Sequence, residues 1–406
     1  MGKSFMLRFA LGLAAALAAA PLAWAQDKPP LVIAKQSYFY VGGHYDTTHD
    51  AHHMVGQMYV EYEIPQAKTH PFPIVMVHGG SQTGLDWIGT PDGREGWEQF
   101  FLRRGYAVYV VDQVGRGRSN YEGDVYGKQS SETREYAHQR FAASEKYNTW
   151  PQAHLHTQWP GGADFEDPTM RNYMASSAPS MADRRMQTTM NVEALSALLD
   201  KIGPSIVFVH SQSGQYGWPL AQARPALVKA LVALEPSGPP VHDLVVQGEP
   251  RFGVAFDAAT SHGDDERFRD SPSLKRYGPV DVPLAYDPPI TDPAQLKFVR
   301  QDKAEAPDVA RCWRQAEPAR KLVAVGDRPI IYIAAEASFY APYSHCTVGY
   351  LEQAGVHVDF VHLADLGIHG NGHMMMMEKN SDQVAEVAAR WLEEKVGPLE
   401  KQAQAH

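Results

Sequence analysis

The chain has 406 residues, with 47 acidic and 37 basic side chains and a formal net charge of −10. This acidic balance gives no electrostatic reason to bind nucleic acid or an anionic membrane, so we expect neither as a partner. Hydrophobic residues make up 44% of the chain and charged residues 21%, which is typical of a folded protein and argues against disorder.

The first 25 residues have the pattern of a secretory signal peptide. Lys3 and Arg8 form a basic start, residues 11–20 an apolar centre, and Ala23-Trp24-Ala25 a cleavage site of the small-x-small type. The apolar centre is shorter than the ~20 residues that a membrane span needs, and no later stretch approaches that length. We therefore expect a mature chain from about Gln26, secreted or periplasmic, without a membrane span.

Hydrophobic patterns predict strands that alternate with helices. The predicted strands cover residues 38–41, 56–64, 73–77, 106–112, 205–210, 229–235, 328–335 and 356–363. The predicted helices cover residues 96–104, 181–201 and 382–395, and a helix-compatible segment follows Ser211. The alternation predicts an α/β fold with a mostly parallel sheet, helices on both faces and a ligand crevice beyond the carboxyl ends of the strands.

Two long segments interrupt this alternation. Residues 120–179 are polar, aromatic and rich in turn residues, and residues 239–325 are rich in proline and charge. A long segment without periodicity, placed directly after a strand, is more often a cap over a site than an idle loop. We expect residues 26–406 to form one domain with these two segments as cap insertions.

The strand at residues 73–77 runs into His78-Gly79-Gly80-Ser81. A glycine-rich turn of this kind lets a backbone N–H approach a substrate carbonyl and stabilise the oxyanion that forms there. We assign Gly80 as one oxyanion donor, with Ser81 as the alternative. His78 is expected to shape the loop and not to transfer a proton.

The strand at residues 205–210 ends at Ser211-Gln212-Ser213-Gly214, which has the layout of a nucleophile elbow. The match to the usual pattern is partial, because Val209 stands in place of its first glycine. We assign Ser211 as the nucleophile, since an elbow at Ser213 would place Gln215 where a small residue is needed. The N–H of Gln212 is then the second oxyanion donor.

A serine needs a base, and a histidine held by a carboxylate is the usual one. His373 closes Gly370-Asn371-Gly372-His373 between the last strand and the last helix, and we assign it as the base, with His369 as its rival. Two residues are candidates for the carboxylate that holds this histidine: Glu235 after the sixth predicted strand and Glu336 after the seventh. Local sequence leaves this choice open.

The motifs occur in the order found in α/β-hydrolases, a fold that the chain resembles. Residues 56–62, 210–212, 235–236 and 369–376 are also similar to those of a secreted bacterial esterase subfamily within that fold. The resemblance implies a Ser-His-Glu triad whose acid follows strand six, which corresponds here to Ser211, His373 and Glu235. In most α/β-hydrolases the acid is an aspartate after strand seven, where this chain has Ser338.

These features predict a carboxylic ester hydrolase that acts on a small-molecule ester through a serine acyl-enzyme, without a cofactor. A lactonase or amidase on the same triad, or a catalytically inactive binding protein of this fold, are the alternatives. Aromatic residues in and near the insertions, such as Trp150, Trp159, Tyr340 and Tyr343, suggest a partly apolar substrate.

The cysteines and the histidine-rich segments are the candidates for crosslinks and metal ligands. Cys312 and Cys346 are the two cysteines of the chain, and in an exported protein an even pair predicts a disulfide, with two free thiols as the alternative. The histidines between His44 and His53, and the pair His154 and His156, lack the spacing of a known metal motif, so we expect no metal site.

Overall fold

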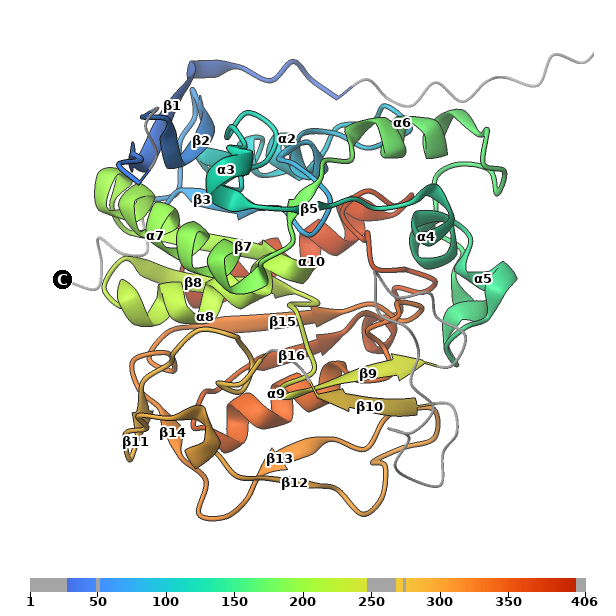
Figure 1. Ribbon diagram of the computed structural model, residues 1–406. Helices are drawn as coiled ribbons and strands as arrows, with labels where there is room; N and C mark the ends of the chain where they lie inside the picture. Colours follow the sequence, from blue (N-terminus) through green and yellow to red (C-terminus); the bar gives the residue numbers. More distant parts are fainter. Residues whose placement is uncertain (1–27, 49–51, 247–267, 273–274, 399–406) are drawn as a thin grey trace, which may run out of the picture. The chain divides into compact units, whose positions relative to one another are not determined.

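The computed structural model describes residues 28–48, 52–246, 268–272 and 275–398 (Figure 1). The predicted signal peptide at residues 1–25 lies outside these ranges. The helices and strands belong to a unit that begins at Val32. None of the helices within the described ranges combines the length and the apolar character needed to cross a bilayer.

Within the described residues, eight strands form one sheet in the order β1-β2-β4-β3-β7-β8-β15-β16. β1 and β2 pair antiparallel, β2 is antiparallel to β4, and the other neighbours are parallel. The strands are β1 (Ile33–Tyr45), β2 (Met54–Pro65), β3 (Ile74–Val77), β4 (Val108–Asp112), β7 (Ser205–His210), β8 (Val228–Leu234), β15 (Ile330–Ala334) and β16 (Asp359–His362). The predicted α/β fold with a mostly parallel sheet is therefore confirmed.

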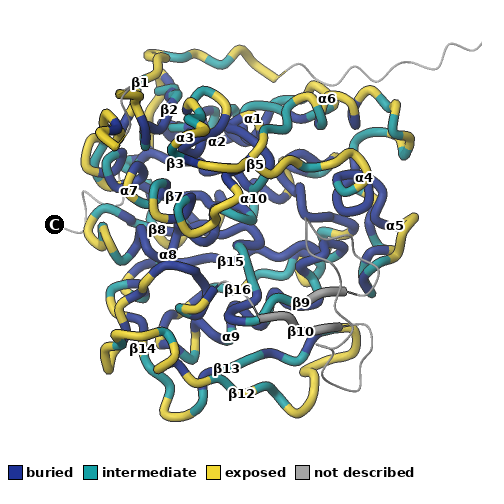
Figure 2. Tube along the Cα trace, in the orientation of Figure 1, coloured by how far each residue is buried: buried dark blue, intermediate teal, exposed yellow. Residues whose placement is uncertain are grey.

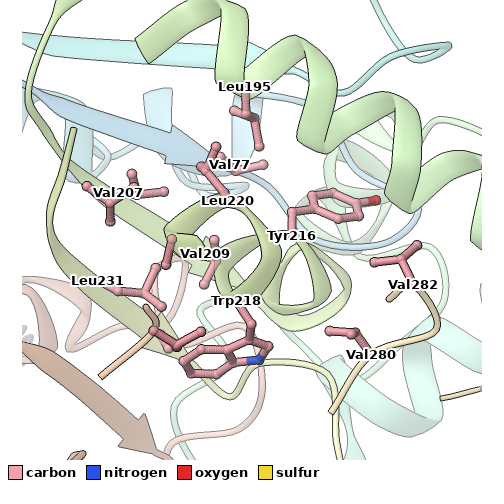
Figure 3. Packing of buried hydrophobic residues seen from close by; sticks show 14 of the residues in the cluster. Val77, Leu195, Val207, Val209, Tyr216, Trp218, Leu220, Leu231, Val280 and Val282 are labelled. Atoms are coloured by element: carbon pink, nitrogen blue, oxygen red, sulfur yellow. The ribbon is translucent and has the colours of Figure 1, made fainter. Parts of the chain in front are cut away.

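One face of the sheet packs against α7 (Arg184–Ile202) and α8 (Gly214–Ala223). Figure 3 shows Val207 and Val209 of β7 directed toward this layer, where Leu195 and Leu220 belong to the same buried cluster. Because side chains alternate along a strand, the residues between them point to the opposite face. Both faces of β7 are thus covered, which explains its continuous apolar sequence.

The other face packs against α2 (Trp97–Leu102), and α2 contacts the C-terminal helix α10 (Ser381–Lys395). The ring of Phe208 lies edge-on to Trp97 at 6.3 Å and to Phe101 at 5.2 Å between centroids. Figure 2 shows the central strands buried and the exposed residues mainly in the peripheral segments.

The insertion at residues 120–179 folds mainly into short helices, each shorter than the window in which a helical period can be recognised. It holds α3 (Gly123–Tyr126), β5 (Gln129–Ser130), α4 (Arg134–Ala137), the π-helix η1 (His138–Ala142), α5 (Ser144–Tyr147), the 3-10 helix η2 (Ala153–Leu155) and α6 (Pro168–Ser176). β6 (Ser180–Met181) follows it and pairs with β5. Part of this insertion contacts the loops after β15 and β16: the indole N–H of Trp150 donates to the carbonyl of Ala337, and the N–H of Thr157 donates to that of Gly370.

The segment at residues 239–325 contributes small two-stranded sheets outside the main one. They are β9 (His242–Val246) with β10 (Phe268–Pro272), β11 (Tyr286–Asp287) with β14 (Lys321–Leu322), and β12 (Phe298–Arg300) with β13 (Trp313–Gln315); a 3-10 helix, η5 (Pro293–Gln295), precedes β12. The expected disulfide is present between Cys312 and Cys346, and it joins this segment to α9 (Ser344–Gln353). Native disulfides of this kind typically contribute about 2–4 kcal/mol to stability.

The boundaries of the predicted elements differ from the observed ones by a few residues, and α9 is among the helices that the sequence patterns do not predict. The strand expected at residues 38–41 extends over Ile33–Tyr45, because it pairs with nearly all of β2. Helix α9 contains Thr347, Val348 and Gly349, which are weak helix formers. Its buried face packs against β13, so tertiary contacts outweigh the local propensity.

Candidate active site

The turn after β7 has the strained backbone of a nucleophile elbow. Ser211 has φ of 52°, a left-handed conformation that costs of the order of 1–3 kcal/mol for a residue with a side chain. The carbonyl of Ser211 accepts a hydrogen bond from the N–H of Ser237 at 2.7 Å, which helps to hold this conformation. A Cβ atom on Gly214 would lie 2.2 Å from Cβ of Pro236, so this position needs a glycine.

The two serines of the elbow have different environments. The hydroxyl of Ser213 is fully buried, accepts the N–H of His210 at 2.8 Å and donates to the carbonyl of Val77 at 2.9 Å. Ser213 is thereby occupied in holding the turn together. Ser211 is partly exposed at the tip of the elbow, as the sequence assignment of the nucleophile requires.

Glu235, which follows β8, and His373, in the loop between β16 and α10, form a buried pair. Nδ1 of His373 lies 2.6 Å from Oε2 of Glu235, and both side chains are almost fully buried. The same carboxylate accepts the N–H of Ala335 at 2.9 Å and the hydroxyl of Ser338 at 2.6 Å. Ser338, which stands after β15 where most α/β-hydrolases have an aspartate, therefore donates a hydrogen bond to Glu235 after β8.

Burial shifts both groups of this pair toward their uncharged forms. It raises the pKa of Glu235 to about 8, although the hydrogen bonds from Ser338 and Ala335 act in the opposite direction. Burial also lowers the pKa of His373 well below its ordinary value, and the nearby positive charge of Arg140 adds to this effect. The imidazole is therefore neutral at physiological pH, as a proton acceptor must be.

Aromatic rings surround His373. The ring of Tyr340 stacks on it at 4.7 Å with an interplanar angle of 5°, and Phe339 lies at 4.6 Å. The ring of His210, next to the elbow serine, lies 4.5 Å from the ring of His373. Nε2 of His373 is buried and has no hydrogen-bond partner among the described residues, so a nitrogen is available beside the elbow.

The two rival residues pair with each other. Nδ1 of His369 lies 3.0 Å from Oε1 of Glu336, and Oε2 of Glu336 accepts the N–H of Gly370 at 2.8 Å. His369 is 64% exposed, whereas His373 is almost completely buried. The structure thus separates a surface pair, His369 with Glu336, from the buried pair, His373 with Glu235.

The two residues assigned as oxyanion donors lie side by side. A Cβ atom built on Gly80 would lie 3.7 Å from Cβ of Gln212, and one built on Gly79 only 3.2 Å from Cβ of Ser211. The glycine loop therefore approaches the elbow closely. The N–H of Ser81, the alternative donor, is directed to the hydroxyl of Ser180 at 3.4 Å, which leaves Gly80 as the better candidate.

A buried ion pair between His156 and Glu378 contacts the loop of His373, and no local sequence pattern indicates it. Nε2 of His156 lies 2.8 Å from Oε1 of Glu378, and Glu378 also accepts the N–H of Gly372 and the side-chain amide of Asn371. His156 lies in the segment at residues 120–179, and the sequence shows it only as a potential metal ligand in the pair His154 and His156. Through this pair the segment at residues 120–179 supports the loop that carries His373.

The pairing of His156 predicts a loss of stability at alkaline pH. Burial alone would lower the pKa of His156, but Glu145 and Glu378 outweigh it and raise the pKa to about 9. The pKa of histidine in the unfolded chain is about 6.5, so protonated His156 adds up to about 3 kcal/mol to the free energy of unfolding. This stabilisation is fully present below pH 6.5 and is lost as the pH rises through 9. Urea unfolding at pH 6.5 and 9.5 measures it.

A matched pair of variants tests this assignment. His156→Gln should lower stability at pH 6.5 and lose most of the difference between the two pH values, whereas the exposed His369→Gln should keep it. If His156→Gln retains the full alkaline loss of the unmodified protein, another group is responsible.

In the described part of the chain, the one group of three close ligand-type residues is Cys312, His345 and Cys346, and both of its cysteines are used by the disulfide. Nδ1 of His154 lies 2.8 Å from the carbonyl of Pro151. The histidine segment between His44 and His53 falls partly outside the described residues.

Known proteins are similar to this chain over most of its length. The sequence matches the family described as "Alpha/beta hydrolase family" over residues 74–387. It is 42% identical over 357 residues, 88% of this chain and 89% of the relative, to the "Probable secreted lipase phiG" of Fungal sp. (strain ATCC 74256).

A solved structure described as a novel bacterial esterase is similar with a TM-score of 0.57 and 23% identity, covering 91% of this chain and 98% of the other. At this level of identity the likeness shows the fold alone. The family match covers the elbow, the glycine loop and the buried His373–Glu235 pair, and the 42% identical relative covers most of the chain. The chain therefore belongs to the alpha/beta hydrolase family.

Proposed function

We propose that this chain is a secreted carboxylic ester hydrolase in which Ser211 is the nucleophile, His373 the base and Glu235 the acid. The observation that carries the proposal is the buried His373–Glu235 pair, which leaves Nε2 of His373 without a partner beside the strained elbow. A carboxylate that accepts Nδ1–H leaves Nε2 deprotonated, and this is the tautomer that can accept a proton from serine.

The reaction follows from this geometry. The Ser211 hydroxyl oxygen attacks the ester carbonyl carbon while Nε2 of His373 accepts its proton. The carbonyl oxygen becomes an oxyanion, which the N–H groups of Gly80 and Gln212 stabilise. The tetrahedral intermediate then expels the alcohol, which takes the proton from His373. Water, deprotonated by His373, attacks the acyl-enzyme in the same manner and releases the acid and free Ser211.

The rings around His373 support a substrate with an apolar group. Phe141, Phe339 and Tyr340 present aromatic surface next to the reacting atoms, and such rings bind acyl or aryl groups well. The description of the fungal relative as a lipase agrees with an apolar acyl chain, and its description as secreted agrees with the leader pattern of residues 1–25.

Two measurements test the proposal. The purified mature chain should hydrolyse p-nitrophenyl esters, and a series of increasing acyl length distinguishes an esterase from a lipase. An organophosphonate should label one serine covalently, and peptide mapping should place the label on Ser211. Parallel assays with lactones and anilides test the same machinery on other carbonyls. Folded protein that hydrolyses none of these and takes up no label would be a binding protein.

A further inference from the structure

The peptide group between Gly79 and Gly80 is held firmly from its carbonyl side. The carbonyl oxygen of Gly79 accepts Nη1 of Arg116 at 2.8 Å and lies 2.9 Å from Nδ1 of His78. The side-chain amide of Gln113 adds a longer contact at 3.4 Å. Because a trans peptide is planar, the orientation of the Gly79 carbonyl fixes the direction of the Gly80 N–H on the opposite side.

The tautomer of His78 follows from its neighbours. Its Nε2 accepts the backbone N–H of Gln113 at 3.0 Å, so Nδ1 carries the proton and donates it to the Gly79 carbonyl. Burial, together with the charge of Arg116, lowers the pKa of His78 to about 3, so the ring stays neutral. Two N–H donors thus polarise one carbonyl, which makes the Gly80 N–H of the same peptide a stronger donor.

The other end of the Arg116 guanidinium holds the second oxyanion residue. Nη2 of Arg116 donates to Oε1 of Gln212 at 2.5 Å, and the side-chain amide of Gln212 donates to Oε1 of Gln187 at 2.8 Å. One guanidinium therefore bridges the glycine loop and the elbow. Its planar, forked geometry suits this task, and a lysine ammonium could not reproduce it.

The charge of Arg116 is buried near the place where the oxyanion forms. The residue is 2% exposed, and both of these acceptors are neutral oxygens. Burial lowers its pKa to about 10, so it remains charged at neutral pH. The nearby Asp86 acts in the opposite direction on the pKa of Arg116, while burial raises the pKa of Asp86 itself. A buried positive charge next to the Gly79–Gly80 peptide attracts a negative charge that develops there.

We propose that Arg116 is a positioning residue for catalysis: it aligns the N–H groups of Gly80 and Gln212 and lends its charge to the oxyanion. This inference rests on the proposed function, because it assumes that an oxyanion forms at these two donors. It extends that function to a side chain that binds the Gly79 carbonyl and the side chain of Gln212.

The experiment compares Arg116→Gln and Arg116→Lys with a control arginine. Arg328 is also buried and also donates to backbone carbonyls, those of Ala221 at 2.9 Å and Pro225 at 3.5 Å, but it lies at the opposite ends of the strands. Each variant is assayed for kcat and KM with a p-nitrophenyl ester, for affinity toward a trifluoromethyl ketone that forms the tetrahedral adduct, and for thermal unfolding.

Arg116→Gln should lower kcat by about 10²–10³-fold, the usual loss when an oxyanion donor fails, with a much smaller change in KM. Affinity for the trifluoromethyl ketone should fall in parallel. Arg116→Lys should lie between Arg116→Gln and the unmodified protein, because it keeps the charge and loses the bridge. Arg328→Gln should lower the unfolding temperature and leave kcat and ketone affinity near their original values.

The inference would be overturned if both Arg116 variants kept kcat and ketone affinity within about twofold of the unmodified protein, because the loss of an oxyanion donor changes kcat far more than this. It would equally be overturned if their losses only matched a loss of folded protein, as in Arg328→Gln. If Arg116→Gln does not fold, Arg116→Lys and an Arg116→Ala variant with added guanidinium decide the matter, since rescue of kcat by guanidinium supports the role and its absence in folded protein contradicts it. Failure of the proposed function is distinguishable, because the unmodified protein would then show neither hydrolysis nor labelling at Ser211.

Discussion

Ser211→Ala is expected to abolish covalent labelling by an organophosphonate and to lower kcat for ester hydrolysis by about a million-fold, the effect of deleting the nucleophile of a serine triad. The physical reason is that no other hydroxyl of the elbow is presented as Ser211 is, partly exposed on a backbone with φ of 52°. Stopped-flow or endpoint assays with a p-nitrophenyl ester measure the loss, and mass spectrometry of the labelled peptide measures the adduct.

Ser213→Ala is the matched control. The Ser213 hydroxyl accepts a hydrogen bond from the N–H of His210 and donates one to the carbonyl of Val77. Removal of the hydroxyl leaves these two buried backbone groups without that partner. Such a loss typically costs about 1–3 kcal/mol of stability. We expect a lower unfolding temperature with a measurable fraction of the activity retained. An adduct mapped to Ser213 in the unmodified protein would show that the assigned register of the elbow is wrong.

The fold could be predicted from the sequence because its central strands are buried on both faces. In β7 and β8 nearly every side chain is buried, so the apolar runs are continuous and easily recognised. The site positions follow from the same topology, since the carboxyl ends of parallel strands share one edge of the sheet. Ser211, Glu235 and the loop of Gly80 all come directly after such strands.

The groups that support the site could not be predicted, because they act through distant contacts. His156 contacts Glu378, which is 222 positions away in the sequence, and no local pattern reports such a pair. Arg116 lies in a Gly-Arg-Gly turn that is visible in the sequence, but its two acceptors come from different loops. The choice between Glu235 and Glu336 was open for the same reason: it depends on which histidine each carboxylate meets in space.

Glu235→Gln is expected to lower kcat by about ten-thousand-fold with little change in fold. The N–H of Ala335 is buried and needs an acceptor, so the glutamine oxygen should take the place of Oε1. Its NH₂ group would then face Nδ1 of His373, where Oε2 now accepts. Nδ1 would have to accept that hydrogen bond, and the proton would move to Nε2, the tautomer that cannot take a proton from Ser211.

Two further measurements separate this role from a general loss of structure. In the unmodified protein the active form needs neutral His373 together with ionised Glu235, whose pKa burial raises to about 8. The value of kcat/KM should therefore rise as the pH rises through about 8, and Glu235→Gln should lack this rise because no ionisation remains at that position. Glu336→Gln, at the exposed His369 pair, should keep both the rate and the pH profile. If Glu336→Gln loses activity and Glu235→Gln keeps it, the acid of the triad is Glu336 after β15. The buried carboxylate of Glu235 would then have only a structural role in holding His373.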